Sequence, residues 1–242
     1  MLLLSLATLL LTAPPVPTGT ELVQQMRARY DGKWYRTLTF VQTTHTYGPT
    51  PRTETWYEAA RIPGMLRIDV APVDSGKTIF FRNDSIYQTK GGAVAVSRAL
   101  VHPLMVLGFD VYLDPVEKTV ARLQGLGFDL TKVHETTWQG TPVYVVGALA
   151  GDTTSKQFWV EKDRLLFVRM LEPVPDGSGR VSETQFNRYQ PLGRGWIAVE
   201  VVFKIGDQVR MKEEYADVRG DVTLPEALWD PARYGRPGWV QP

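Results

Sequence analysis

The chain has 242 residues, of which 43% are hydrophobic, 22% charged and 11% aromatic, and this composition is typical of a folded globular protein. Lys and Arg number 27 against 26 Asp and Glu, for a net charge of +1. With no excess of positive charge to hold a polyanion, we expect no nucleic-acid partner. The absence of cysteine excludes disulfides, thiolate nucleophiles and lipid attached through cysteine.

The N-terminus carries a targeting pattern. Residues 2–12 are an apolar run followed by Ala13, Pro14 and Pro15, and a helix of this length spans roughly 16 Å, too short for a ~30 Å hydrocarbon core. We interpret residues 1–19 as a cleaved signal peptide, with a retained membrane anchor and a buried structural segment as alternatives. Residues 20–242 then form a single domain.

Most of the remaining chain has the pattern of β-strands. A capping box at Thr18 and Glu21 predicts one amphipathic helix over 20–31. A second helical region is predicted from 100 to 125, where Pro115 opens a helix that ends at Gly125. Alternating apolar and polar residues predict strands elsewhere. These segments are 37–42, 53–60, 65–71, 77–82, 85–89, 93–97, 132–138, 141–149, 155–161, 164–171, 181–189, 195–205 and 208–218.

These elements predict an α+β fold dominated by one curved antiparallel sheet of about eleven to twelve strands, because consecutive hairpins pair with their neighbours. The predicted helices are too short to cover one whole face of such a sheet. We therefore expect either a closed barrel or an apolar groove on the concave face, and the surplus of aromatic residues favours a lipid-sized cavity.

The sequence offers little from which to build an enzyme. The three histidines, His45, His102 and His134, have no metal-binding spacing, and no serine has the context of a nucleophile. Glu213 and Glu214 are adjacent, so on a strand they point to opposite faces, and we interpret both as solvated or as part of a sheet edge. We expect no catalytic activity, no metal and no cofactor.

Several short patterns resemble the bacterial outer-membrane lipoprotein carrier family (LolA/LolB-like), and together they extend over about residues 20–230. They follow the order of that family from its first strands to its paired C-terminal strands. The segments are Phe40-Val-Gln42, the strand with Trp56, 63–69, 83–87, His102-Pro-Leu-Met-Val-Leu107, 157–163 and 165–169. The chain resembles a divergent member, in which Ile62, preceded by Arg61, stands where the family has a basic residue that latches the lid.

The resemblance implies an unclosed half β-barrel with an N-terminal helix and a short helical lid over an apolar cavity. It implies a periplasmic carrier that binds acyl chains of lipoproteins or phospholipid and moves them toward the outer membrane. An inner-membrane release complex and an outer-membrane acceptor would be its partners, with transient membrane contact and a monomeric state. The alternative is a periplasmic sensor or scaffold of the same fold that recognises lipoproteins and signals to a protein partner.

Alternation on the predicted strands identifies candidate ligand-binding residues. Each candidate occupies a period-2 apolar position on a separate or neighbouring strand and is expected to face the cavity, and the lid is expected to insert apolar side chains into it. The cavity candidates are Phe40, Trp56, Leu66, Ile68, Phe81, Phe158 and Phe203, and the lid candidates are Leu104, Met105 and Leu107.

Overall fold

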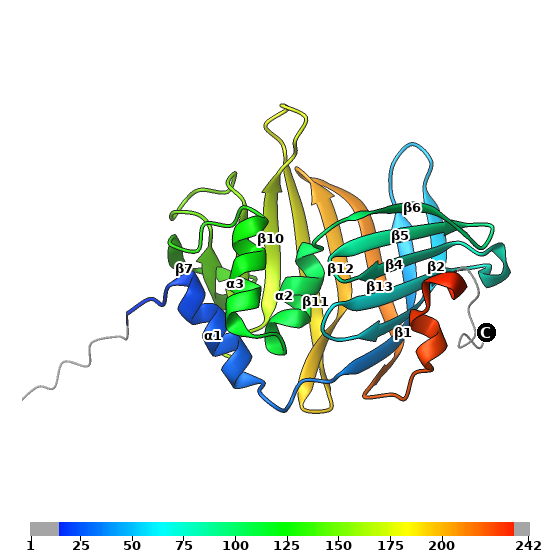
Figure 1. The fold of residues 1–242 in the computed structure, drawn as a ribbon. Helices are drawn as coiled ribbons and strands as arrows, with labels where there is room; N and C mark the ends of the chain where they lie inside the picture. Colours follow the sequence, from blue (N-terminus) through cyan, green and yellow to red (C-terminus); the bar gives the residue numbers. More distant parts are fainter. Residues whose placement is uncertain (1–14, 235–242) are drawn as a thin grey trace, which may run out of the picture.

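The computed structural model describes residues 15–234, and Figure 1 shows a strongly curved sheet with helices on its concave side. Within these residues thirteen strands form one antiparallel, unclosed sheet, which confirms the predicted fold. The strands are β1 (Thr37–Thr46), β2 (Arg52–Arg61), β3 (Met65–Val70), β4 (Thr78–Arg82), β5 (Ser85–Lys90), β6 (Ala93–Ala99), β7 (Val133–Trp138), β8 (Thr141–Val146), β9 (Gln157–Glu161), β10 (Phe167–Pro173), β11 (Val181–Leu192), β12 (Gly195–Ile205) and β13 (Gln208–Gly220).

The strand order divides the sheet into two meanders. One runs from β6 back to β1 and the other from β13 back to β7, and each consists of strands that follow one another in sequence. They are joined by the pairing of β1 with β13, in which Leu38 lies opposite Gly220. The ends of the described sheet are β6 and β7.

Tight turns between the strands have the residues that their backbone requires. Asn83 and Asp84, between β4 and β5, both have positive φ, at 50° and 55°, as a two-residue hairpin turn of type I′ demands. Gly76 has φ of 63°, and a Cβ there would lie 2.3 Å from the backbone nitrogen of Gly92. The turns that contain Gly76 and Gly92 come so close together that only glycine fits at position 76.

Helices α1 (Gly19–Arg29) and α3 (Val116–Gly125) pack on the β7–β12 half of the sheet. The predicted capping box is present, because Thr18 accepts a hydrogen bond from the Glu21 nitrogen and Glu21 accepts one from the Thr18 nitrogen. The short helix α2 (Pro103–Gly108) and the 3₁₀ turn η2 (Asp110–Tyr112) lie between this half and the β1–β5 half. Within residues 15–234 no helix combines the length and apolar content needed to cross a bilayer.

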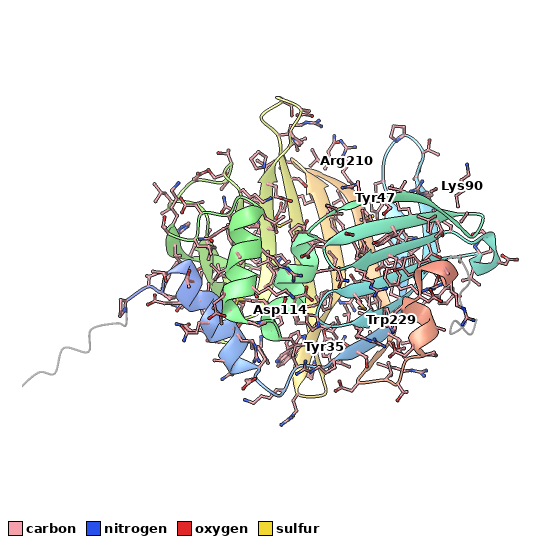
Figure 2. All side chains as sticks on the ribbon, viewed as in Figure 1. Tyr35, Tyr47, Lys90, Asp114, Arg210 and Trp229 are labelled. Carbon is pink, nitrogen blue, oxygen red and sulfur yellow. The ribbon has the colours of Figure 1, made fainter. Side chains whose placement is uncertain are left out.

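A C-terminal segment covers part of the outer face. The 3₁₀ turns η3 (Glu226–Trp229) and η4 (Pro231–Arg233) lie beside β2–β4 in Figure 1. Figure 2 labels Trp229, which packs with Phe80 of β4 in an apolar cluster. Arg67 is fully buried beneath this segment, where it pairs with Asp69 and donates to the carbonyl oxygens of Leu228 and Tyr234 at 3.1 and 2.7 Å.

The predicted signal peptide, residues 1–19, lies mostly outside the described residues, because positions 1–14 are not among them. Its last two residues belong to the fold. Thr18 caps α1, and the Gly19 nitrogen donates to the Leu130 carbonyl at 2.9 Å. Both the signal peptide and the boundary at residue 20 stay predictions.

Candidate functional site

A cavity of about 280 Å³ lies between the concave face of the sheet and α2. Its walls come from β1–β5 and β11–β13, and its cover from the segment around α2. Most lining side chains are apolar. The lining consists of Leu38, Phe40, Gln42, Trp56, Glu58, Ala60, Ile62, Met65, Leu66, Ile68, Ile79, Phe81, Ile86, Gln88, His102, Leu104, Met105, Phe109, Asp110, Phe186, Val201, Phe203, Met211, Glu213 and Tyr215.

Strand register explains why these side chains meet. Directly paired residues of neighbouring strands point to the same face of a sheet. Phe40 of β1 pairs with Glu58 of β2, which pairs with Ile68 of β3, and Ile68 pairs with Ile79 of β4. On the other side of β1, Gln42 pairs with Tyr215 of β13. The alternation in the sequence therefore produces one continuous concave wall.

The structure brings six of the seven cavity candidates together around this cavity. They come from five different strands, and their convergence follows from the register. The six are Phe40, Trp56, Leu66, Ile68, Phe81 and Phe203. Two of the three lid candidates, Leu104 and Met105, line the same cavity from α2. That these residues bind a ligand stays a prediction.

Phe158 and Leu107 lie elsewhere. Phe158 on β9 is fully buried beneath α1 and α3, with its ring against that of Phe128 at 5.2 Å. Leu107 is also fully buried, on the side of α2 that packs into the main core. The phase of Phe158 on its strand points it to the concave side, but helices fill that part of the concavity. Alternation cannot tell which strands a helix covers.

Two buried carboxyl groups lie in the apolar wall, and the interpretation of Glu213 as a solvated or edge residue is wrong. Glu213 is 8% exposed and Glu58 3% exposed, and both line the cavity. Strand β13 is interior to the sheet, between β1 and β12. The alternation itself holds, since the neighbouring Glu214 points outward to pair with Lys212. The sequence does contain a signal for this burial. Alternate residues of a strand point to the same face, so Glu58 shares the face of Trp56 and Glu213 shares the face of Tyr215.

Burial sets the ionisation of these groups. It raises the pKa of Glu213 to about 7, although hydrogen bonds from Tyr215 and Gln42 act in the opposite direction. The Tyr215 hydroxyl donates to Glu213 Oε2 at 3.0 Å. Burial, with the negative charge of Glu213 as a second cause, raises the pKa of Glu58 well above its ordinary value. In a buried site without water or a cation, the charged form of a carboxyl group is higher in free energy than the protonated form.

The cover is tied to the sheet by a carboxylate. Asp110, at the start of η2, accepts a hydrogen bond from the backbone nitrogen of Gly64 at 3.0 Å. Arg122 of α3 holds Asp110 and also pairs with Asp114, labelled in Figure 2. Ile62 lines the cavity, whereas Arg61 pairs with Glu226 of the C-terminal segment. The contact between turn and cover is therefore made by Asp110 and a backbone group.

His102, just before α2, also lines the cavity. Burial lowers its pKa to about 4, so its imidazole is neutral at neutral pH. Its Nδ1 atom and the Nε1 atom of Trp56 are buried without a hydrogen-bond partner. Among residues 15–234, no group of three or more His, Asp or Glu side chains is arranged to hold a metal ion.

Comparisons with known proteins found similarity in structure. No protein-family model and no curated protein matches the chain. A DUF1329 family protein from Desulfovibrio piger is 14% identical, with a TM-score of 0.61 over 88% of this chain and 95% of its own. A protein domain assigned to outer-membrane lipoprotein sorting, from Vibrio parahaemolyticus, is 14% identical, with a TM-score of 0.62 over 90% and 98%.

A LolA superfamily protein from Nitrosomonas europaea has a TM-score of 0.54 at 10% identity, over 88% of this chain and 98% of its own. The chain has a LolA-like fold. Each of the three solved chains is matched over nearly its whole length, so the likeness extends over the whole fold.

Proposed function

We propose that this protein is a periplasmic carrier that binds the acyl chains of lipoproteins or lipids in its cavity and moves them toward the outer membrane. The observation that carries the proposal is the apolar cavity of about 280 Å³ beneath α2. An engineered apolar cavity of about 150 Å³ stays dry and binds benzene. By that scale, this cavity has room for roughly ten carbon atoms of a chain.

The residues around the cavity favour binding over chemistry. Among the described residues that line it there is no Ser, Thr or Lys to serve as a nucleophile. The polar groups present are carboxyls, amides, one imidazole, one indole N–H and one phenol in an otherwise apolar wall. Such a wall suits a chain-like ligand that is held by the hydrophobic effect. We therefore propose a non-enzymatic role with no cofactor.

The LolA-like fold supports the direction of transport, since one solved chain with this fold is assigned to outer-membrane lipoprotein sorting. The carrier would act as a monomer in the periplasm, after removal of the signal peptide. It would receive cargo from an inner-membrane release complex and give it to an outer-membrane acceptor, with transient contact to each membrane.

Native mass spectrometry of the protein purified from its own cell envelope tests the proposal. We expect a bound species with the mass of a lipid or an acylated peptide. Ala60→Trp places a large side chain in the cavity and should abolish this species. Val94→Trp adds the same side chain on the exposed strand β6 and should retain it. Ligand-free protein, or equal loading of both variants, would contradict the carrier function.

A further inference from the structure

The wall of the cavity contains three carboxyl groups, and only one of them, Asp110, is paired with a positive charge, on Arg122. Glu58, Glu213 and Asp110 are its carboxyl groups, and no Lys or Arg is among the described residues of its lining. His102 adds no charge at neutral pH, because burial lowers its pKa to about 4. A carboxylate that is removed from water costs several kcal/mol unless a cation or hydrogen bonds compensate it. The cavity therefore disfavours the binding of anionic groups.

The carboxyl groups differ in how far the protein satisfies them. Asp110 is held by Gly64 and Arg122, and Glu213 accepts from Tyr215. Glu58 is 97% buried and faces the cavity, but no other described residue forms a hydrogen bond or an ion pair with it. Because nearly all buried polar groups in proteins are paired, Glu58 lacks a partner that a ligand could supply.

Aromatic residues are neighbours of Glu58 in the cavity wall. Phe40 is the cross-strand partner of Glu58, and its ring lies 4.4 Å from that of Tyr215 between the centroids. Trp56 follows on the same face of β2. Aromatic faces attract cations, and cages of aromatic rings are a common way to recognise ammonium groups. Carboxylate and rings thus favour the same kind of ligand.

We infer that the cavity receives a long-chain amine, that is, an apolar chain carrying a protonated amino group that pairs with Glu58 and Glu213. The inference rests on the proposed function and adds a choice of head group to it. The chain fills the wall formed by β3, β4 and α2, and the ammonium group supplies the missing cation. An alkyl carboxylate would instead bring a negative charge beside Glu58 and Glu213, which disfavours their charged forms.

Binding of such an amine releases a proton. Glu58 and Glu213 hold protons more tightly than ordinary glutamates in the empty cavity, and the ammonium group stabilises their charged forms. The other titratable groups that face the cavity are Tyr215 on β13, and His102 and Asp110 on either side of α2. Amine affinity should therefore increase from about pH 6 to about pH 8, and affinity for an alkyl carboxylate should decrease.

The test compares decylamine, decanol and decanoate as competitors of the neutral fluorophore N-phenyl-naphthylamine. At about pH 7.5 we expect decylamine to bind about tenfold or more tightly than decanol, as for a charge-assisted hydrogen bond, and decanoate to bind most weakly. The variants Glu58→Gln and Glu213→Gln should each lose most of the preference for the amine while they still bind decanol. Glu214→Gln, on the outward face of the same strand, should behave as the wild type.

The outcomes separate the two proposals. Equal affinity for the three probes, tightest binding of decanoate, or an amine preference that survives in Glu58→Gln would overturn the amine inference and leave the carrier function in place. If no probe displaces the fluorophore from folded wild-type protein, both proposals are wrong. Thermal unfolding of each variant checks that it is folded.

Discussion

The carboxyl group of Asp110 accepts a hydrogen bond from the backbone nitrogen of Gly64 at 3.0 Å, and so joins the cover of the cavity to the turn between β2 and β3. Both residues lie at the rim of the cavity or beside it. Opening of the cover on that side must break this bond. The contact thus sets part of the barrier that a ligand has to cross.

Asp110→Ala should loosen the cover. Loss of the acceptor leaves the Gly64 nitrogen unpaired, which costs about 1–3 kcal/mol in the closed state. We expect the neutral fluorophore N-phenyl-naphthylamine to associate faster in stopped-flow measurements. Asp110→Asn keeps an acceptor oxygen without the charge and should restore most of the slow association. Identical rates in wild type and Asp110→Ala would show that the contact does not limit entry.

Two leucines on α2 should respond differently to the same substitution. Leu104 faces the cavity, so Leu104→Ser should increase the association rate of a chain-like probe with a small change in stability. Leu107 is fully buried in the main core, so Leu107→Ser should cost on the order of 2–5 kcal/mol of unfolding free energy. Urea unfolding and stopped-flow fluorescence measure the two effects. A large loss of stability in Leu104→Ser would identify that residue as core instead.

Glu213 should make stability depend on pH. Burial raises its pKa in the folded protein to about 7, from an ordinary value of 4.5. Because the folded pKa is the higher one, this contribution to stability is fully present below about pH 4.5 and is lost as the pH rises through about 7. Glu213→Gln should therefore match the wild type near pH 4.5 and exceed it by about 3 kcal/mol near pH 8.5.

Urea unfolding of both proteins at the two pH values measures this difference. Glu214→Gln is the control, since hydrogen bonding to Lys212 lowers the pKa of that exposed carboxyl group. A stability difference between wild type and Glu213→Gln that stays constant across the pH range would contradict the argument.

The start of α1 predicts where the chain can be shortened. Removal of residues 1–16 keeps the capping box formed by Thr18 and Glu21, and we expect no loss of stability. Removal of residues 1–19 deletes the cap and the bond from Gly19 to Leu130, which should cost about 1 kcal/mol or more. Thr18→Ala removes the cap alone and should lower the free energy of unfolding by about 1 kcal/mol. Denaturant midpoints of the purified proteins distinguish these cases.

Arg67 should be essential for attachment of the C-terminal segment. It pairs with Asp69 at 2.8 Å, and both side chains are almost fully buried. Arg67→Ala leaves Asp69 buried beside fewer partners and should cost about 3–5 kcal/mol. The double variant Arg67→Met, Asp69→Leu should be much more stable than the single one. Additive losses in the double variant would show that the pair does not act as a unit.

The sequence predicts the strands and turns well because both depend on local rules. Alternation in β1 and positive φ at Asn83 need only neighbouring residues. Contacts between segments that are distant in the sequence cannot be predicted from such local rules. Phe158 lies under helices because α1 and α3 settle on that half of the sheet, and nothing in the alternation encodes that choice. Glu58 and Glu213 were missed because burial of a carboxyl group is costly, so sequence reasoning places it in solvent.

The pairing of β1 with β13 has a mechanical consequence. It is the single strand pairing that joins the two meanders within residues 15–234, and the cavity lies across it, since its walls come from β1–β5 on one side and β11–β13 on the other. A bound chain would contact both meanders at once. Such a chain would therefore link the two meanders across the β1–β13 pairing, and the force needed to pull them apart would depend on whether the cavity is occupied.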